Sequence, residues 1–373
     1  MANIPQSNYV NINFTYSATS SIVGSVPNTI LFGDDTSITA EKTYTSLADV
    51  LTDYENTTDV YKAAALYFNN GGQSLILVPL GSSSASTDAL TALQTYTNVI
   101  CVSMLNTTNF DIAEMAELLY TNEDNFAYKK ILIVASGSSV TDPVTPTELA
   151  TYGNTVLMNV PTSAYKTYAP IGIAGVLSGY DATKVNALMP LQFQQLSGME
   201  RFVTDATTGS AVNALIAEGW CVMVNVAGKY IFLDGAQLVN GEPIHSAWGF
   251  SVLKNNLENA VFNALLEKLP YATSSETTLQ NVINGICNQF ITNGLISTNS
   301  VYTGATQSVS YNGTTYTLIT QNVTLTNGYL VYEIPIANAS DTDKSAGKIP
   351  PIYVFVVIND AIRMVEITGE VRK

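Results

Sequence analysis

The chain has 373 residues, of which 46% are hydrophobic and only 12% charged, and its formal net charge is −15. This length predicts two or three domains, and this hydrophobic content excludes wholesale disorder. The acidic balance argues against nucleic-acid binding, which needs a basic surface, and equally against binding to anionic membranes. A surface so poor in charge suits a protein that packs against copies of itself, and a secreted or surface protein with the same bias is the alternative.

The cysteines and the N-terminal sequence bear on where the protein folds. Cys101, Cys221 and Cys287 are odd in number and far apart, so they predict neither a disulfide framework nor a metal site. We expect buried free thiols and folding in a reducing cytoplasm. No signal pattern opens the sequence, and the longest apolar run, 352–358, is too short to cross a bilayer. The sequence therefore predicts no membrane insertion.

Residues 1–24 are predicted to form an N-terminal arm. Val10, Ile12, Phe14 and Tyr16 alternate with polar residues, which is the period of a strand with one buried face. The small residues that follow, 17–25, read as a linker. A single strand needs a sheet edge for pairing, and that edge belongs either to the same chain or to a neighbouring copy.

Residues 25–200 are predicted to form an α/β domain, because strand and helix patterns alternate along them. This rhythm favours a mainly parallel sheet covered by helices. The stretch 161–200 is less regular, and Gly172, Gly175 and Gly179 there suggest a close-packed or flexible junction. The predicted strands are 29–32, 74–78, 99–105, 130–135 and 155–160, and the predicted helices are 46–54, 59–69, 87–96, 111–120 and 146–152.

Residues 201–343 are predicted to form a second, α+β domain. A helix at 211–218 precedes strands at 220–226 and 230–233, and two longer helices follow at 247–269 and 276–293. The sequence Thr273-Ser274-Ser275-Glu276 has the pattern of a capping box at the start of the second long helix. Asn312-Gly313 and Asn327-Gly328 then predict two-residue hairpin turns, and 337–348 reads as a polar linker.

Residues 344–373 are predicted to form a C-terminal β arm with strands at 353–358 and 362–368. This segment has five basic and three acidic residues, so a basic tail follows an acidic body and could form an electrostatic latch between copies. The predicted inter-subunit strand residues are Val10, Ile12, Phe14, Tyr16, Tyr353, Phe355, Val357, Ile362, Met364 and Ile367. The predicted latch residues are Lys344, Lys348, Arg363, Arg372 and Lys373.

Motifs for catalysis and cofactor binding are missing from the sequence. The single histidine, His245, has no nucleophile motif beside it, and the glycines at 172 and 175 lack the third glycine of a dinucleotide fingerprint. Asp34-Asp35 reads as an exposed turn, with a cation site as the alternative. We therefore predict no cofactor, no metal and no enzyme activity. A cytosolic α/β enzyme, hydrolase-like and of unknown substrate, remains the alternative hypothesis.

Several segments together resemble the tail sheath proteins of contractile-tailed bacteriophages. The order helix, glycine and strand at 214–218, Gly219 and 220–226 is similar to a family element, as is the pair of long helices ending at Gly294. Near the N-terminus, Phe68-Asn69-Asn70-Gly71-Gly72 before the strand 74–78 resembles the family's helix, double glycine and strand. The entry Ile349-Pro350-Pro351-Ile352 to a terminal hairpin and the turn at Asp234-Gly235 also match in position.

This resemblance implies a structural subunit of a virion, assembled in the host cytoplasm. Its copies would form stacked hexameric rings and a helical sheath around a tail tube protein, by exchanging terminal strands with neighbours. Baseplate and tail terminator proteins would be further partners, and neither nucleic acid nor a membrane would be bound. Contraction of the sheath would drive the tube through the host envelope.

Overall fold

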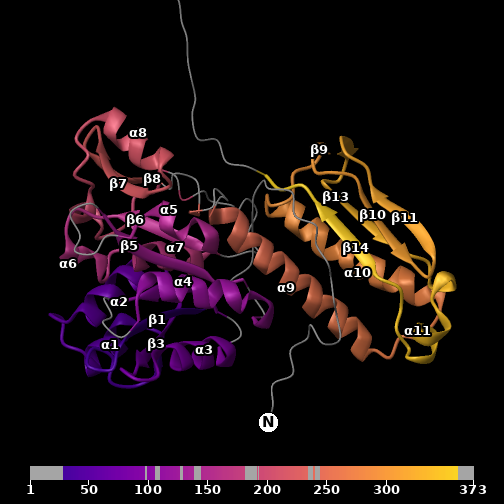
Figure 1. Ribbon diagram of the computed structural model, residues 1–373, viewed down its shortest axis with the longest axis horizontal. Coiled ribbons are helices and arrows are strands. Elements are labelled where there is room, and N and C mark those ends of the chain that lie inside the picture. Colours follow the sequence, from indigo (N-terminus) through magenta and orange to yellow (C-terminus); the bar gives the residue numbers. More distant parts are fainter. Residues whose placement is uncertain are drawn as a thin grey trace, which may run out of the picture.

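The structure is a computed structural model that describes residues 28–96, 99–105, 110–126, 129–137, 144–180, 191, 193–233, 238–239 and 244–359. The predicted N-terminal arm lies outside these residues, as do Ile362, Arg363, Met364, Ile367, Arg372 and Lys373. Figure 1 shows an α/β body, coloured indigo to rose, beside an orange and yellow C-terminal part, with helix α9 between them. The mixed α/β architecture predicted from the sequence is confirmed.

An eight-stranded sheet forms the centre of the body, in the order β2-β3-β1-β4-β5-β6-β7-β8. The six inner strands are parallel, and the two edge strands pair antiparallel. The sheet includes β7 and β8, which follow residue 200 in the chain. The predicted boundary between two domains at residue 200 therefore falls inside this sheet, and the domain boundaries stay a prediction. The strands are β1 Asn28–Asp34, β2 Lys42–Tyr44, β3 Ser74–Leu80, β4 Val99–Met104, β5 Ile131–Ser136, β6 Thr155–Asn159, β7 Cys221–Val226 and β8 Lys229–Leu233.

Helices cover both faces of this sheet, because side chains along each strand alternate between two apolar cores. On β3, Leu75 and Leu77 enter one core, and Ile76 and Val78 enter the other. We call these the first and the second core. Helices α1 Leu47–Asp53, α2 Asp59–Asn69, α6 Ser163–Lys166 and α7 Ile171–Gly179 lie over the first core, and α3 Ala85–Thr95, α4 Ile112–Thr121, α5 Pro146–Leu149 and α8 Gly209–Ala217 lie over the second.

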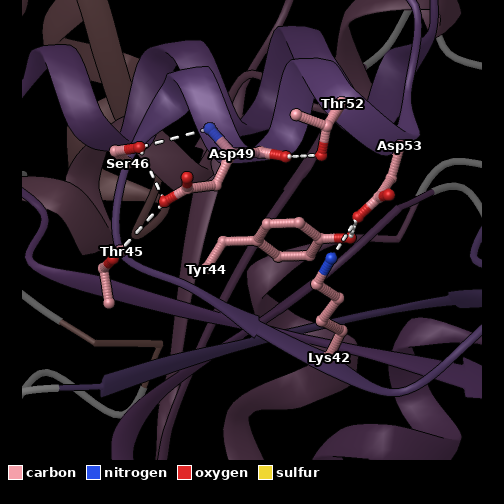
Figure 2. A network of polar contacts seen from close by, with 7 residues as sticks. All are labelled: Lys42, Tyr44, Thr45, Ser46, Asp49, Thr52 and Asp53. Carbon is pink, nitrogen blue, oxygen red and sulfur yellow. Dashed lines mark hydrogen bonds and ion pairs between the residues drawn. The ribbon is translucent and has the colours of Figure 1, made fainter.

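A polar network fixes the short edge strand β2 to helix α1. Figure 2 shows Lys42 and Tyr44 both pointing toward the carboxylate of Asp53. The Lys42 ammonium donates to this carboxylate at 2.5 Å, and the Tyr44 hydroxyl donates at 2.7 Å. The hydrogen bond from Lys42 is the main reason that the pKa of Asp53 lies below its usual value. At the other end of the helix, Ser46 is the N-cap and accepts from the Asp49 amide.

Glycines let helices α2 and α7 approach closely. A Cβ atom on Gly175 would lie 2.4 Å from the carbonyl oxygen of Tyr67, and one on Gly179 would lie 2.7 Å from that of Gly71. Because backbone atoms are the obstacle, no side-chain rotation relieves either clash. The three glycines noted in the sequence therefore belong to a close-packed helix, the first of the two alternatives.

We predict that Gly175→Ala destabilises the protein by about 1–3 kcal/mol, as overpacking does. The control is Gly285→Ala in α10 Thr273–Thr292, where a Cβ meets nothing within 4 Å. Both changes raise helix propensity, so the control should gain up to about 1 kcal/mol. Denaturant unfolding measures both free energies, and equal effects of the two substitutions would contradict the close approach.

Lys130 directly precedes β5 and carries a buried ammonium group, with only 1% of the residue exposed. Its Nζ donates to the carbonyl oxygen of Val99 at 2.5 Å and lies 5.5 Å from the centre of the Phe126 ring. Burial lowers the pKa of Lys130 to about 7, partly offset by Cys101. The folded state therefore binds this proton more weakly than the unfolded chain does, whose lysine pKa is near 10.4.

We predict that this contribution to stability rises with pH between about 7 and 10, since the unfolded state then carries the extra proton. Lys130→Met should abolish that rise and make the protein more stable at pH 7, because no charge is then buried. Unfolding free energies of both proteins at pH 7 and pH 9.5 test this. A variant less stable than the wild type at pH 7 would show that the ammonium has a compensating partner.

Helix α9, Ile244–Leu266, joins the body to the C-terminal part. Near its start Trp248 packs edge-on against Tyr180, with ring centres 5.4 Å apart, and along its length it contacts α10. Residues of α9, α10 and the strands β13 and β14 all belong to the first core.

Helix α9 ends three residues before the predicted position, and Lys268 then has a φ of 60°. Among the described residues, no helix is long and apolar enough to cross a membrane.

Short antiparallel ladders complete the C-terminal part. Asn312-Gly313 forms the predicted hairpin turn, with both residues at positive φ. The hairpin predicted at Asn327-Gly328 is wrong, because only Gly328 has a positive φ and the strands on either side of it pair with different partners. The elements are β9 Ser300–Tyr302, β10 Gln307–Tyr311, β11 Thr314–Ile319, β12 Val323–Leu325, β13 Tyr329–Glu333, α11 Asp341–Ser345 and β14 Ile352–Val356.

Candidate assembly surfaces

The predicted C-terminal arm begins with strand β14, which pairs antiparallel with β13 of the same chain. Tyr353 lies opposite Tyr332, and Phe355 lies opposite Leu330. Phe355 is 2% exposed and packs edge-on against Tyr302, with ring centres 6.0 Å apart. These two predicted inter-subunit residues thus belong to the fold of their own chain. A strand has two edges, and pairing of the other edge with a neighbour stays a prediction.

The chain leaves β14 at a fixed point. The Val357 amide donates to the carbonyl of Gly328 at 2.7 Å, and the Val357 carbonyl accepts from the Ser297 amide at 2.8 Å. Asn359 donates its amide to Leu295 and its side chain to Gly294, at the C-terminus of α10. Gly294 has the positive φ expected of a helix stop. An arm that reaches another copy would therefore start after residue 359.

The predicted linker at 337–348 is wrong in its middle part, because residues 341–345 form helix α11. Ser340 caps this helix by accepting from the Asp343 amide, and Tyr311 donates its hydroxyl to the Asp343 carboxylate at 2.7 Å. That hydrogen bond lowers the pKa of Asp343, and burial followed by Asp343 raises the pKa of Tyr311 to about 12. A tyrosine 32 residues away thus holds a segment that looks like a linker in the sequence.

Two of the five predicted latch residues lie in the described part of the chain. Lys344 Nζ is 3.9 Å from Asp341, and Lys348 Nζ is 3.4 Å from Asp343. Both lysines are exposed and pair with acids of their own chain, and exposed pairs of this kind contribute little to stability. Their role as a latch between copies stays a prediction.

The predicted capping box at Thr273–Glu276 is wrong. The N-cap of α10 is Ala272, which makes no side-chain hydrogen bond, and Ser275 instead donates to the carbonyl of Pro270 at 2.5 Å. The carboxylate of Glu276 accepts from the backbone amide of Ile336, 60 residues further along. A long-range hydrogen bond has thus replaced the local one that the pattern predicts.

Glu333, at the end of β13, lies near Glu276 and was not singled out from the sequence. Its Oε1 atom is buried and accepts no hydrogen bond in the structure. Burial, and then the charge of Glu276, raise the pKa of Glu333 to about 7. Ionising a carboxylate whose buried oxygen has no hydrogen-bond donor costs free energy. The surroundings of Glu333 therefore favour its protonated form at mildly acidic pH.

We predict that the contribution of Glu333 to stability is present below about pH 4.5 and is lost as the pH rises through about 7, because the folded state holds the proton more tightly. Glu333→Gln should remove this loss, so the variant should gain stability relative to the wild type at pH 8 and not at pH 4. Glu117→Gln, at an exposed position of α4, is the control. Denaturant midpoints at pH 4 and pH 8 measure the difference in stability. The same change in midpoint between the two pH values in all three proteins would contradict the raised pKa of Glu333.

Groups that could perform chemistry are sparse in the described part of the chain. His245 lies in the first turn of α9, and no cluster of three or more His, Cys, Asp or Glu residues there could hold a metal ion. The three cysteines are buried and form no disulfide, as predicted. A pocket of about 380 Å³ lies at the carboxyl ends of β1 and β3 and is lined by Asp35, Glu41 and Asp88.

Comparisons with known proteins bear on the whole chain. Residues 244–371 match the family described as E217 tail sheath protein gp31-like, C-terminal domain. No curated protein sequence matches the chain. A chain of the anti-feeding prophage baseplate, solved with 6-fold symmetry, superimposes with a TM-score of 0.67 at 13% identity and covers 98% of both chains.

Two sheath structures in the contracted state are also similar. The helical sheath of the anti-feeding prophage gives a TM-score of 0.60 at 14% identity and covers 97% of this chain and 98% of that one. The sheath of the extracellular contractile injection system PVC gives 0.61 at 12% identity, with 97% and 96% covered.

The chain superimposes over nearly its full length on two contracted sheath structures, so it has the fold of those sheath proteins. Residues 244–371 match the family model of the E217 gp31-like tail sheath C-terminal domain, and the resemblance to phage tail sheath proteins drawn from the sequence is confirmed.

Proposed function

We propose that this protein is the structural subunit of a contractile sheath and that it works by polymerising and contracting. The observation that carries the proposal is the match over 97% and more of the chain to proteins of contractile systems, together with the sheath family match of residues 244–371. The sparse charge of the chain, 12% of residues, suits extended contacts between copies.

The proposed mechanism of assembly is strand exchange between copies. Residues 10–16 and the segment after Asn359 each add a strand to a neighbour's sheet, and the edge of β14 that pairs with no described strand accepts one. Main-chain hydrogen bonds then hold the copies together while their bodies reorient. The hydrogen bonds of Asn359 to Leu295 and Gly294 support this proposal, because they separate strand β14, which packs in its own chain, from the segment proposed to bind a neighbour.

The assembly we propose is a stack of hexameric rings around a tail tube, ended by baseplate and terminator proteins. The 6-fold symmetry of the similar baseplate structure supports this ring size. The sheath is part of a phage tail, is assembled in the host cytoplasm, and drives the tube through the host envelope when it contracts. We propose no catalytic role, since no observation favours the alternative of a hydrolase-like enzyme.

The purified protein should form hollow cylinders in negative-stain micrographs. Deleting 1–20 or 360–373 should leave a folded chain that forms no tubes, because each deletion removes one donated strand and keeps β14. Removal of 349–373 is the contrasting variant, which should unfold the C-terminal part because Phe355 is lost from its core. Normal tubes from both short deletions would overturn strand exchange, and globular particles from the intact protein would overturn the sheath assignment.

A further inference from the structure

An arginine on the body surface contacts two aromatic rings and has no carboxylate partner among the described residues. Arg201, in the short 3-10 helix Glu200–Phe202, has its guanidinium carbon 5.3 Å from the centre of the Phe202 ring and 5.9 Å from that of Tyr168. Both rings are buried and lie edge-to-face, with centres 5.9 Å apart. Lys62 approaches Tyr168 at 5.4 Å. We call these four residues the stacked-arginine surface.

The charges around Arg201 leave its donors unused. Lys62 is paired with Asp59 at 2.7 Å, whereas Arg201 is exposed and makes no ion pair or hydrogen bond with any described residue, its neighbour Glu200 included. Cation–π attraction holds the guanidinium beside the two rings and leaves its N–H groups available to an acceptor. Such an arginine can make a bidentate contact with a carboxylate.

The acid-lined pocket offers carboxylates without cations. Asp35 is exposed, and its carboxylate makes no hydrogen bond or ion pair with a described residue. Glu41 accepts from the Tyr96 hydroxyl at 2.5 Å, and Asp88 accepts from the Gly81 amide at 3.0 Å. Within the described part of the chain, none of the three acids pairs with a lysine or arginine. The pocket therefore concentrates negative charge around a hollow of about 380 Å³.

The sheet separates these two surfaces within one chain. Tyr168 and Phe202 belong to the first core, and Val78 and Ala92, which line the pocket, belong to the second core on the opposite face. The arginine and the pocket therefore cannot meet in the same copy. They can meet between two copies, and because the two surfaces differ, the contact is head-to-tail and can repeat around a ring or along a helix.

We propose that Arg201 of one copy binds the acid-lined pocket of a second copy, with Asp35 as its carboxylate partner. The inference rests on the proposed sheath assembly and adds a contact between bodies that is independent of the terminal arms. Copies with a net charge of −15 repel one another on average, so a localised pair of opposite charges selects one orientation among many.

A charge swap tests the contact in the full-length protein. Arg201→Glu should raise the protein concentration needed for tube formation about tenfold, because it places a carboxylate against the acids of the pocket. Asp35→Arg should do the same alone, and the two changes together should restore wild-type assembly. Lys229→Glu, an exposed residue of β8 with the same change of charge, is the control and should assemble normally. Thermal unfolding of each unassembled variant verifies that the chain still folds.

The outcomes separate this inference from the proposed function. Wild-type protein that forms no tubes overturns the sheath proposal itself. Normal tubes from the wild type and from Arg201→Glu alike overturn the arginine contact and leave the sheath proposal standing. A defect in Arg201→Glu that Asp35→Arg does not reverse overturns the pocket as the acceptor.

Discussion

The structure depends on one apolar core that continues from the sheet body into the C-terminal part. Helix α9 makes this possible, because its side chains pack against the body near Trp248 and against α10 further along. A buried core of this kind resists bending far more than a linker between two separate domains does. Any motion of the subunit within an assembly must therefore occur mainly at its contacts with other copies. The fixed exit of the chain at Asn359 is consistent with this division between a rigid body and its terminal segments.

The distribution of charge follows from the same constraint. With only 12% of its residues charged, the chain cannot rely on dense ion-pair networks, and several of the pairs it has are exposed and local. A few charges then lie in special surroundings, such as the guanidinium of Arg201 beside two aromatic rings or the carboxylate of Glu333 near Glu276. Among the described residues, the buried Oε1 atom of Glu333 has no hydrogen-bond donor, and the exposed Arg201 has no hydrogen-bond acceptor.

Much of the fold could be predicted from the sequence where the decisive interactions are local. Helix α2 was predicted at 59–69 and lies there, because its apolar stripe and its cap at Thr58 are set within one or two turns. The errors arose where distant residues compete. Glu276 fits a capping box but bonds to Ile336, and 341–345 read as a linker until Tyr311 binds Asp343. The contact between Arg201 and Tyr168 could not be predicted from the sequence, because the two residues are distant in the chain and only folding brings them together.

The anchoring of Asn359 also sets a length scale. Fully extended, residues 360–373 span at most about 50 Å from that point. If this segment stays bound to the same neighbour throughout a rearrangement, the acceptor edge must remain inside that radius in every state of the assembly. Under strand exchange, the change in spacing between adjacent copies would be bounded by a tether that starts where Asn359 is held at the end of α10.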